Sequence, residues 1–169
     1  MGHRLPCVSR LLLLDGHSLA YRAFFALPAE NFSTKTGQHT NAVYGFTSML
    51  INVLRDEDPT HLAVAFDVSR DTFRAQEYAE YKAGRSATPS EFSGQLPLLR
   101  EVLDALKIRW IEVPGFEADD IIATLTTQAT ERDMEVVICS GDRDAFQLVS
   151  DRVTLLYPVR GVSEVWRMD

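Results

Sequence analysis

Short apolar runs recur along the chain, and each one stops at a polar or charged residue or at a turn. Five such runs lie at residues 10–14, 61–66, 108–113, 134–139 and 153–157. They are brief and nearly continuous, which is typical of strands that are buried on both faces of a sheet. The pattern therefore predicts five buried strands.

The stretches between these runs carry apolar residues at helical spacing. In residues 41–54, Val43, Phe46 and Leu50 share one face of a helix that Thr40 or Asn41 would cap. Helices that alternate with strands predict right-handed βαβ units and a mainly parallel sheet, hence an α/β fold. The expected helices cover residues 18–27, 41–54, 88–106 and 117–130, and a short one, capped at residues 141–144, ends at residue 149.

Seven carboxylates lie where predicted strands end and helices begin. Ligands of parallel sheets bind beyond the carboxyl ends of the strands, so we expect these side chains to converge there. Carboxylates that gather so closely repel one another unless cations hold them, and an oxygen-only site selects Mg²⁺ or Mn²⁺. Hard ions between carboxylates support phosphodiester hydrolysis. The seven are Asp15, Asp67, Glu117, Asp119, Asp120, Asp142 and Asp144.

Each acidic group also has a purely structural interpretation. Asp15 with Gly16 can form a turn, and Asp67 can cap a helix. Acids at 117–120 can compensate a helix dipole, and one of the two aspartates at 142–144 can serve as an N-cap. These interpretations explain one acid each, but they do not explain four clusters at equivalent ends of successive α/β units.

Composition and charge narrow the classes of protein. The 169 residues suit one soluble domain, and we expect a cytoplasmic protein because no apolar stretch has the length of a membrane span. A net charge of −7 argues against a nucleic-acid binder, although bound cations would cancel part of it. Cys139 is expected to be buried in a strand, and the histidines are expected to be structural or on the surface, which favours an all-oxygen site over zinc.

Residues 68–88 differ from the rest because they mix charge and aromatic rings without a strong apolar stripe. Basic groups there would bind phosphates, and aromatic faces would stack on bases. The alternative is a solvated helix with internal salt bridges, because acidic residues are interspersed. We expect an exposed, mobile insertion. The residues are Arg70, Arg74, Lys82 and Arg85, with Phe73, Tyr78 and Tyr81 between them.

Several segments of the chain resemble the 5′ nuclease (5′-3′ exonuclease) domain of bacterial DNA polymerase I, which belongs to the flap endonuclease family. The resemblance covers nearly the whole chain from about residue 10. It implies a PIN-like three-layer fold with an inserted helical arch, and a divalent-metal nuclease that acts on 5′ ends and flaps of DNA and on RNA primers. The segments are LDGHSLAYR (14–22), NAVYGF (41–46), AFD (65–67), YAEYKAGR (78–85), GFEADD (115–120) and GDRD (141–144).

The resemblance also implies roles for single residues. Asp15, Asp67, Glu117 and Asp119 resemble a first metal site, and Asp142 and Asp144 resemble a second, with Asp119 or Asp120 near both. Lys82 and Arg74 resemble arch residues that contact the scissile phosphate, and Tyr21 and Arg22 resemble a pair near the 5′ end of the substrate. These roles imply two ions of Mg²⁺ or Mn²⁺ as cofactors and DNA as the partner. The residues expected to contact DNA are Tyr21, Arg22, Arg70, Arg74, Tyr78, Tyr81, Lys82 and Arg85.

The chain departs from the family at its end. The family continues with a helix–hairpin–helix-like segment that grips duplex DNA and supplies further aspartates, whereas this chain stops at Asp169. We therefore expect the N-terminal catalytic part of such a domain over residues 1–169, with weakened DNA affinity and second-ion occupancy. Two other functions stay open, namely a PIN-type ribonuclease and a non-catalytic nucleic-acid-binding fragment. A polymerase domain in the parent chain is a further possibility.

Overall fold

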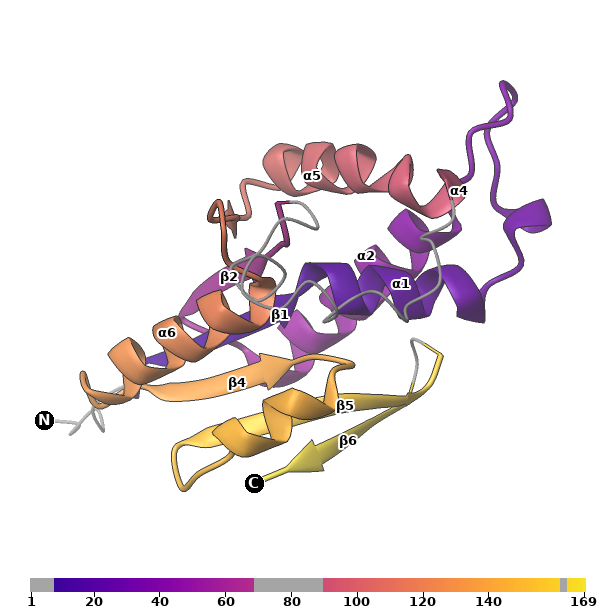
Figure 1. The fold of residues 1–169 in the computed structure, drawn as a ribbon. Helices are drawn as coiled ribbons and strands as arrows, with labels where there is room; N and C mark the ends of the chain where they lie inside the picture. Colours follow the sequence, from indigo (N-terminus) through magenta and orange to yellow (C-terminus); the bar gives the residue numbers. More distant parts are fainter. Residues whose placement is uncertain (1–7, 69–89, 162–163) are drawn as a thin grey trace, which may run out of the picture.

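A central sheet with helices on both faces forms the fold in a computed structural model that describes residues 8–68, 90–161 and 164–169 (Figure 1). The strands are β1 (Arg10–Asp15), β2 (His61–Ala65), β3 (Trp110–Ile111), β4 (Glu135–Cys139), β5 (Val153–Arg160) and β6 (Glu164–Met168). The helices are α1 (Gly16–Ala26), α2 (Asn41–Glu57), α4 (Ser90–Ser93), α5 (Gln95–Ala105) and α6 (Ala118–Thr130), with short 3-10 helices η1 (Ala29–Asn31) and η2 (Arg143–Leu148).

The order of the strands across the sheet is β3-β2-β1-β4-β5-β6. Strands β1 to β5 run parallel, and only β6, the yellow strand beside the C-terminus in Figure 1, runs antiparallel to its neighbour β5. Strand β1 therefore lies in the middle, with its carboxyl end next to those of β2 and β4. This confirms the predicted mainly parallel α/β fold and brings the ends of three acidic segments side by side.

Alternate residues of β1 face two separate apolar layers. Leu12 and Leu14 pack with residues of α1, α2, α4 and α5 on one face. Leu13 packs with residues of α6 and η2 on the other face. All three leucines are almost fully buried, and each such side chain contributes about 1.5–3 kcal/mol to folding. The near-continuous apolar run at the start of the chain is explained by this burial on both faces.

The five predicted strands are present, but their lengths differ. The run at 108–113 contributes only β3, which pairs with β2 through two residues. Residues 107–108 instead form the turn that follows α5, where Lys107 has a φ of 58° and the amide of Ile108 donates to the carbonyl of Leu103. Strand β5 continues past the predicted end to Arg160, where it pairs with β6.

The single helix expected over 88–106 is wrong for the described part, which forms α4 and α5 on either side of Gly94. Pro97 has no amide hydrogen to donate to the carbonyl four residues earlier, and its ring crowds that carbonyl. A proline fits in the first turn of a helix, which is where Pro97 lies in α5. Residues 88–89, with the expected proline cap, lie outside the described residues.

The predicted cap of α2 is also different. Thr40 occupies the N-cap position, but its side chain makes no capping hydrogen bond. The Gln95 side chain takes that role from α5: its Oε1 accepts from the amides of Ala42 (2.8 Å) and Val43 (3.3 Å), and its Nε2 donates to Asn41 Oδ1 (2.8 Å). Local sequence does not reveal such a cap, because the donor and acceptor come from segments far apart in the chain.

Within the described residues, no helix combines the length and apolar character that crossing a bilayer requires.

Candidate metal centre

Asp15 lies at the carboxyl end of the central strand and is almost fully buried. Its Oδ1 accepts a hydrogen bond from the amide of Ser18 (3.1 Å), so Asp15 caps α1. Its Oδ2 accepts from the hydroxyl of Ser140, which follows β4 (3.1 Å). A side chain at Gly16 would meet the Phe66 ring at 2.6 Å, so the helix can start this close to β2 only with glycine. Asp15 is therefore held in place by the first turn of α1 and by the residue that follows β4.

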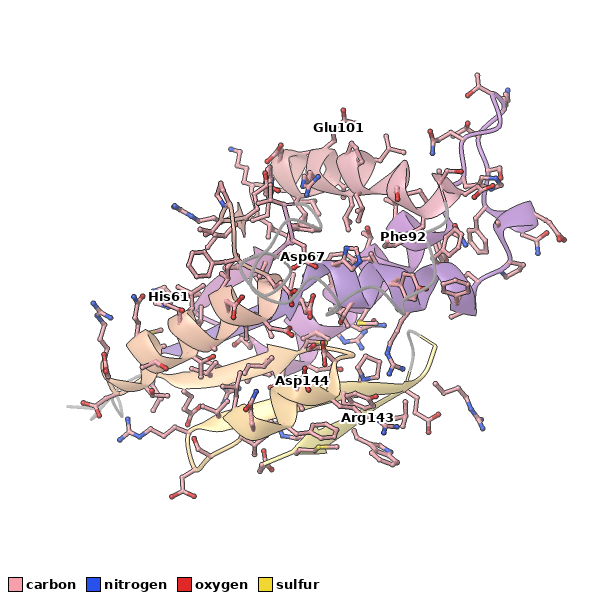
Figure 2. The ribbon with its side chains drawn as sticks, in the orientation of Figure 1. His61, Asp67, Phe92, Glu101, Arg143 and Asp144 are labelled. Atoms are coloured by element: carbon pink, nitrogen blue, oxygen red, sulfur yellow. The ribbon has the colours of Figure 1, made fainter. Side chains whose placement is uncertain are left out.

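Asp67 follows β2 and reaches the first turn of α6. Its Oδ1 accepts a hydrogen bond from the amide of Ala118 (2.6 Å). Figure 2 shows Asp67 and Asp144 in the central part of the molecule, well away from His61 at the opposite end of β2. His61 thus lies far from the acidic residues, in agreement with its predicted role outside the site.

The acids at the start of α6 divide into two kinds. Glu117 and Asp120 form a capping box, in which the amide of Glu117 donates to Asp120 Oδ2 (2.9 Å) and the Glu117 side chain accepts from the amide of Asp120. Both side chains therefore have a structural role, as the helix-end interpretation anticipated. Asp119, between them, takes no part in that pair.

Asp119 instead meets the acids that follow β4. One carboxylate oxygen each from Asp119, Asp142 and Asp144 lies within 4.8 Å of the others. Asp142 caps η2 by accepting from the amide of Asp144 (2.9 Å), which holds the Asp142 side chain against the backbone of Asp144. This is the tightest group of possible ligands among the described residues, and it consists of oxygen donors alone.

The electrostatics of these acids are unfavourable without a cation. Burial, and then the charges of Asp15 and Asp142, raise the pKa of Asp119 from 3.8 to about 8. Burial, with the charges of Asp67 and Asp142, raises the pKa of Asp15 from 3.8 to about 6, although hydrogen bonds from Ser18 and Ser140 oppose the shift. A divalent ion would reverse this penalty because it favours the ionised forms. The residues present therefore fit a hard divalent cation.

The arrangement differs in detail from the predicted division into two sites. Asp119 is close to the later acids Asp142 and Asp144, and charge also couples it to Asp15 and Asp67. Glu117 and Asp120 bond to each other at the edge of this group. The structure thus brings the strand-end acids together as one group around Asp119, and the assignment of ligands to a first or a second ion stays a prediction.

Tyr21 and Arg22 lie on α1 and have different surroundings. Tyr21 is partly exposed and makes edge contacts with the rings of Phe25 (4.8 Å between centroids) and Phe92 (5.3 Å). Arg22 is half-buried, and its guanidinium donates to the Pro158 carbonyl (2.8 Å) and the Tyr157 hydroxyl (2.8 Å). Their predicted contacts with DNA stay predictions. The other predicted DNA contacts lie outside the described residues; they are Arg70, Arg74, Tyr78, Tyr81, Lys82 and Arg85. The prediction that this segment is mobile likewise concerns residues that the structure does not describe.

Two serines that the sequence did not identify as functional hold the site together. Ser18 Oγ accepts from the amide of Gly141 (2.9 Å), and Ser140 Oγ accepts from the amide of Asp142 (3.1 Å) besides donating to Asp15. Position offers the only sequence signal: each serine lies within three residues of a strand-end acid. They link the β1–α1 and β4–η2 junctions directly.

Cys139 is not part of this chemistry. It is fully buried at the end of β4, where its Sγ lies 3.9 Å from Met49 Sδ. Burial, with the nearby charge of Asp15, raises the pKa of its thiol to about 12. The thiol is therefore neutral at physiological pH, which confirms the prediction of a buried structural cysteine.

Comparisons with known proteins agree with the fold and with the resemblance. The chain is 66% identical over 157 residues to DNA polymerase I of Mycobacterium tuberculosis, which covers 93% of this chain and 17% of that protein. It is 50% identical over 156 residues to DNA polymerase I of Bacillus subtilis, covering 92% of this chain and 18% of that protein. The chain thus spans about a sixth of the length of these relatives.

Solved structures share the architecture. The flap endonuclease of bacteriophage T5, crystallised with DNA and metal ions, superposes with a TM-score of 0.67 and 20% identity, covering 88% of this chain and 54% of that chain. The T5 5′-exonuclease with bound zinc gives a TM-score of 0.66 and 22% identity, covering 88% of this chain and 55% of that chain. Residues 10–169 match the family described as 5′-3′ exonuclease, N-terminal resolvase-like domain. With this match and the relatives at 66% and 50% identity, the chain belongs to that family of 5′-3′ exonuclease domains.

Proposed function

We propose that this chain is the catalytic α/β part of a metal-dependent nuclease that hydrolyses phosphodiesters at 5′ ends and 5′ flaps of DNA. The observation that carries the proposal is the meeting of Asp119, Asp142 and Asp144 within 4.8 Å, with Asp15 and Asp67 coupled to them by charge. In the described part of the chain this group consists of carboxylates alone, and such oxygen ligands suit Mg²⁺ or Mn²⁺. Membership of the 5′-3′ exonuclease family supports the same chemistry.

The residues present fit two divalent ions held by carboxylate oxygens. Asp119, Asp142 and Asp144 would hold one of them, and Asp15 and Asp67, with Asp119 between the groups, would hold the other. When bound, such ions activate water and stabilise charge on the leaving oxygen. The chain itself supplies the fixed oxygen atoms. The hydrogen bonds from Ser18, Ser140 and Ala118 orient these carboxylates in advance.

The substrate side of the proposal rests on the resemblance and on the partly exposed ring of Tyr21. Lys82 and Arg74, together with the other basic and aromatic residues of 69–89, would contact phosphates and bases, and Tyr21 would offer an aromatic face near the site. Because these are contacts to backbone and ring faces, the protein would select DNA by end structure rather than by sequence. The flap endonuclease of bacteriophage T5, with the same fold, was crystallised with DNA and metal ions.

Cleavage of a 5′-flap DNA by the purified chain tests this proposal. We expect Mg²⁺- or Mn²⁺-dependent cutting near the flap junction, abolished by EDTA and by the double substitution Asp142→Asn with Asp144→Asn. The exposed Asp151, in the turn before β5, provides a matched control as Asp151→Asn, which should cut normally. Binding without turnover would favour a non-catalytic fragment, and faster cleavage of a matched RNA flap would favour a PIN-type ribonuclease.

A further inference from the structure

Arg22 makes its polar contacts inside the protein, at the loop that carries two of the clustered acids. Its Nη1 donates to the Pro158 carbonyl (2.8 Å), and its Nη2 donates to the Tyr157 hydroxyl (2.8 Å) and, at 3.4 Å, to the Gly141 carbonyl. The guanidinium also lies over the Tyr157 ring, 4.9 Å from its centroid. One side chain thus joins α1, β5 and the loop between β4 and η2.

The loop is shaped to accept this side chain. A Cβ atom at Gly141 would overlap with Arg22 Nε and would meet Arg22 Cδ at 2.8 Å, so any larger residue would displace the arginine. The amide of Gly141 donates to Ser18 Oγ (2.9 Å), one turn before Arg22 on the same helix. Residues 18 and 22 therefore hold the two successive peptide groups on either side of the Gly141 Cα, one through the Gly141 amide and the other through the Gly141 carbonyl.

Asp142 follows Gly141 directly in the chain. Its amide donates to Ser140 Oγ (3.1 Å), and its carboxylate accepts from the amide of Asp144 (2.9 Å). The positions of both carboxylates are thus set by the path of the backbone at Gly141. A shift of that backbone would move Asp142 and Asp144 away from Asp119, with which they share one group within 4.8 Å.

We propose that Arg22 is a positioning residue which, together with Tyr157, fixes the backbone at Gly141 so that Asp142 and Asp144 face Asp119. This role rests on the proposed metal site, and it differs from the direct contact with DNA that the sequence suggested. A planar guanidinium with several donors suits the task, because it bonds at once to three acceptors, two on β5 and one in the loop between β4 and η2. A lysine keeps the charge but not this geometry.

Conservative substitutions separate positioning from phosphate binding. Tyr157→Phe keeps the ring over the guanidinium and removes only the acceptor hydroxyl, and Arg22→Lys keeps the charge. By calorimetry with Mn²⁺ alone, we expect weaker binding by about three- to tenfold for Tyr157→Phe and by about tenfold or more for Arg22→Lys. The controls are Tyr44→Phe, an exposed tyrosine on α2, and Arg132→Lys, an exposed arginine after α6; both should bind Mn²⁺ normally.

Hydrogen exchange gives a readout that needs no metal. The amides of Gly141 and Asp142 should exchange about three- to tenfold faster in both variants, whereas the amide of Val137 in β4 should not change. Unchanged Mn²⁺ affinity and unchanged exchange in Arg22→Lys, together with weaker DNA binding and a salt dependence smaller by about one unit, would overturn the proposal and assign Arg22 to a phosphate. If the wild-type chain bound no Mn²⁺, the proposed function would fail, and the exchange rates alone would decide the positioning role.

Discussion

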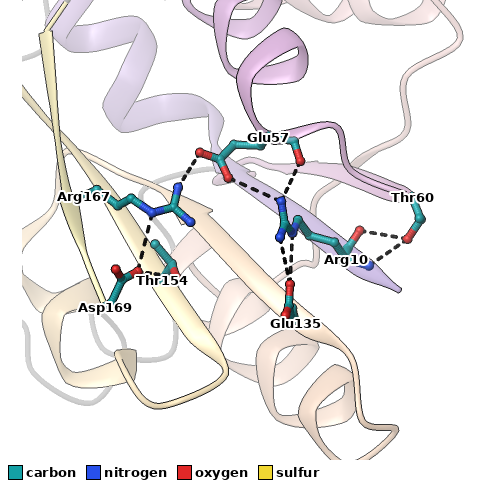
Figure 3. Close-up of polar contacts among 7 residues, drawn as sticks. All are labelled: Arg10, Glu57, Thr60, Glu135, Thr154, Arg167 and Asp169. Atoms are coloured by element: carbon teal, nitrogen blue, oxygen red, sulfur yellow. Dashed lines mark hydrogen bonds and ion pairs between the residues drawn. The ribbon is translucent and has the colours of Figure 1, made fainter. Parts of the chain in front are cut away.

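The two ends of the sheet differ in how their charged side chains are paired. At the amino ends of the strands, Arg10 bonds to Glu135 (2.9 Å) and to the Glu57 carbonyl (2.9 Å), and Arg167 bonds to Glu57 (2.6 Å) (Figure 3). At the carboxyl ends, the neighbours that most perturb Asp119 are the carboxylates of Asp15 and Asp142. The first end joins opposite charges, and the second end gathers like charges.

The difference shows which charges serve stability and which serve function. Glu57 is a nearly buried carboxylate whose two arginine partners tie α2 to β1 and β6, so its charge is compensated within the fold. The acids around Asp119 cost free energy in the ion-free protein, and proteins accept such a cost mainly at functional sites. Buried acidic groups that face other acidic groups therefore indicate the functional site more reliably than the mere presence of charged residues does.

A cavity at the amino end illustrates the same point. A polar hollow of about 140 Å³ is lined by arginines and acids together, including Arg10, Arg152, Glu135 and Asp151. Arg10 and Arg152 already pair with carboxylates. The three arginines of the lining, Arg10, Arg152 and Arg167, all pair with carboxylates of the protein, so we assign the cavity no ligand.

The largest expected effect comes from removing the central acid. Asp119→Asn should weaken Mn²⁺ binding by about 100-fold or more, because it removes a charged ligand shared by the whole group. The same change should stabilise the ion-free protein at pH 8, since it relieves repulsion with Asp15 and Asp142. Calorimetry and thermal unfolding measure the two effects. Glu131, exposed at the other end of α6, provides the control: Glu131→Gln should alter neither the Mn²⁺ affinity nor the stability of the ion-free protein.

The opposite end of the sheet should respond in the opposite way. Glu57→Gln leaves Arg10 and Arg167 without their buried carboxylate, so the free energy of unfolding should fall by about 1–3 kcal/mol. Mn²⁺ affinity should not change. Urea unfolding gives the first quantity, with Asp56→Asn as the control, because exposed Asp56 pairs only with its neighbour Arg55 in the described structure. If Glu57→Gln lowered Mn²⁺ affinity as much as stability, the two ends would not be independent.

A third effect is expected from pH. The pKa values of Asp15 and Asp119 are raised to about 6 and about 8, so the folded protein holds protons that the unfolded chain has already released. The ion-free protein should therefore lose stability as the pH rises from about 4 to about 8 and then level off. Melting temperatures between pH 5 and pH 9 would show this fall, and saturating Mg²⁺ should reduce it. A melting temperature that rises across this range would contradict the assignment.

Sequence alone predicted the regular parts of this molecule. Brief apolar runs that end in acids identified β1, β2 and β4, because burial on both faces leaves little freedom of composition. The acids at those ends could be placed at one edge because parallel strands share their direction.

Sequence did not predict features that depend on contacts across the fold. Gln95 caps α2, and Arg22 donates a hydrogen bond to the Gly141 carbonyl; both contacts join segments far apart in the chain. For the acids at 117–120 the sequence offered compensation of the helix dipole, but not the capping box of Glu117 with Asp120. The three-dimensional arrangement also showed that Asp119 is the acid of this group that lies close to Asp142 and Asp144. Residue types and their spacing are visible in the sequence, but the hydrogen-bond partner of each carboxylate oxygen is not.

The central claim is that the carboxylates around Asp119 exchange a proton for a divalent ion. Calorimetric titration of the chain with Mn²⁺ at pH 7, in two buffers with different ionisation enthalpies, counts the protons released. Because the pKa of Asp119 is about 8, we predict release of about one proton at pH 7, almost none at pH 9, and none from Asp119→Asn. Tight binding at pH 7 without proton release, or no binding at all, would contradict the account.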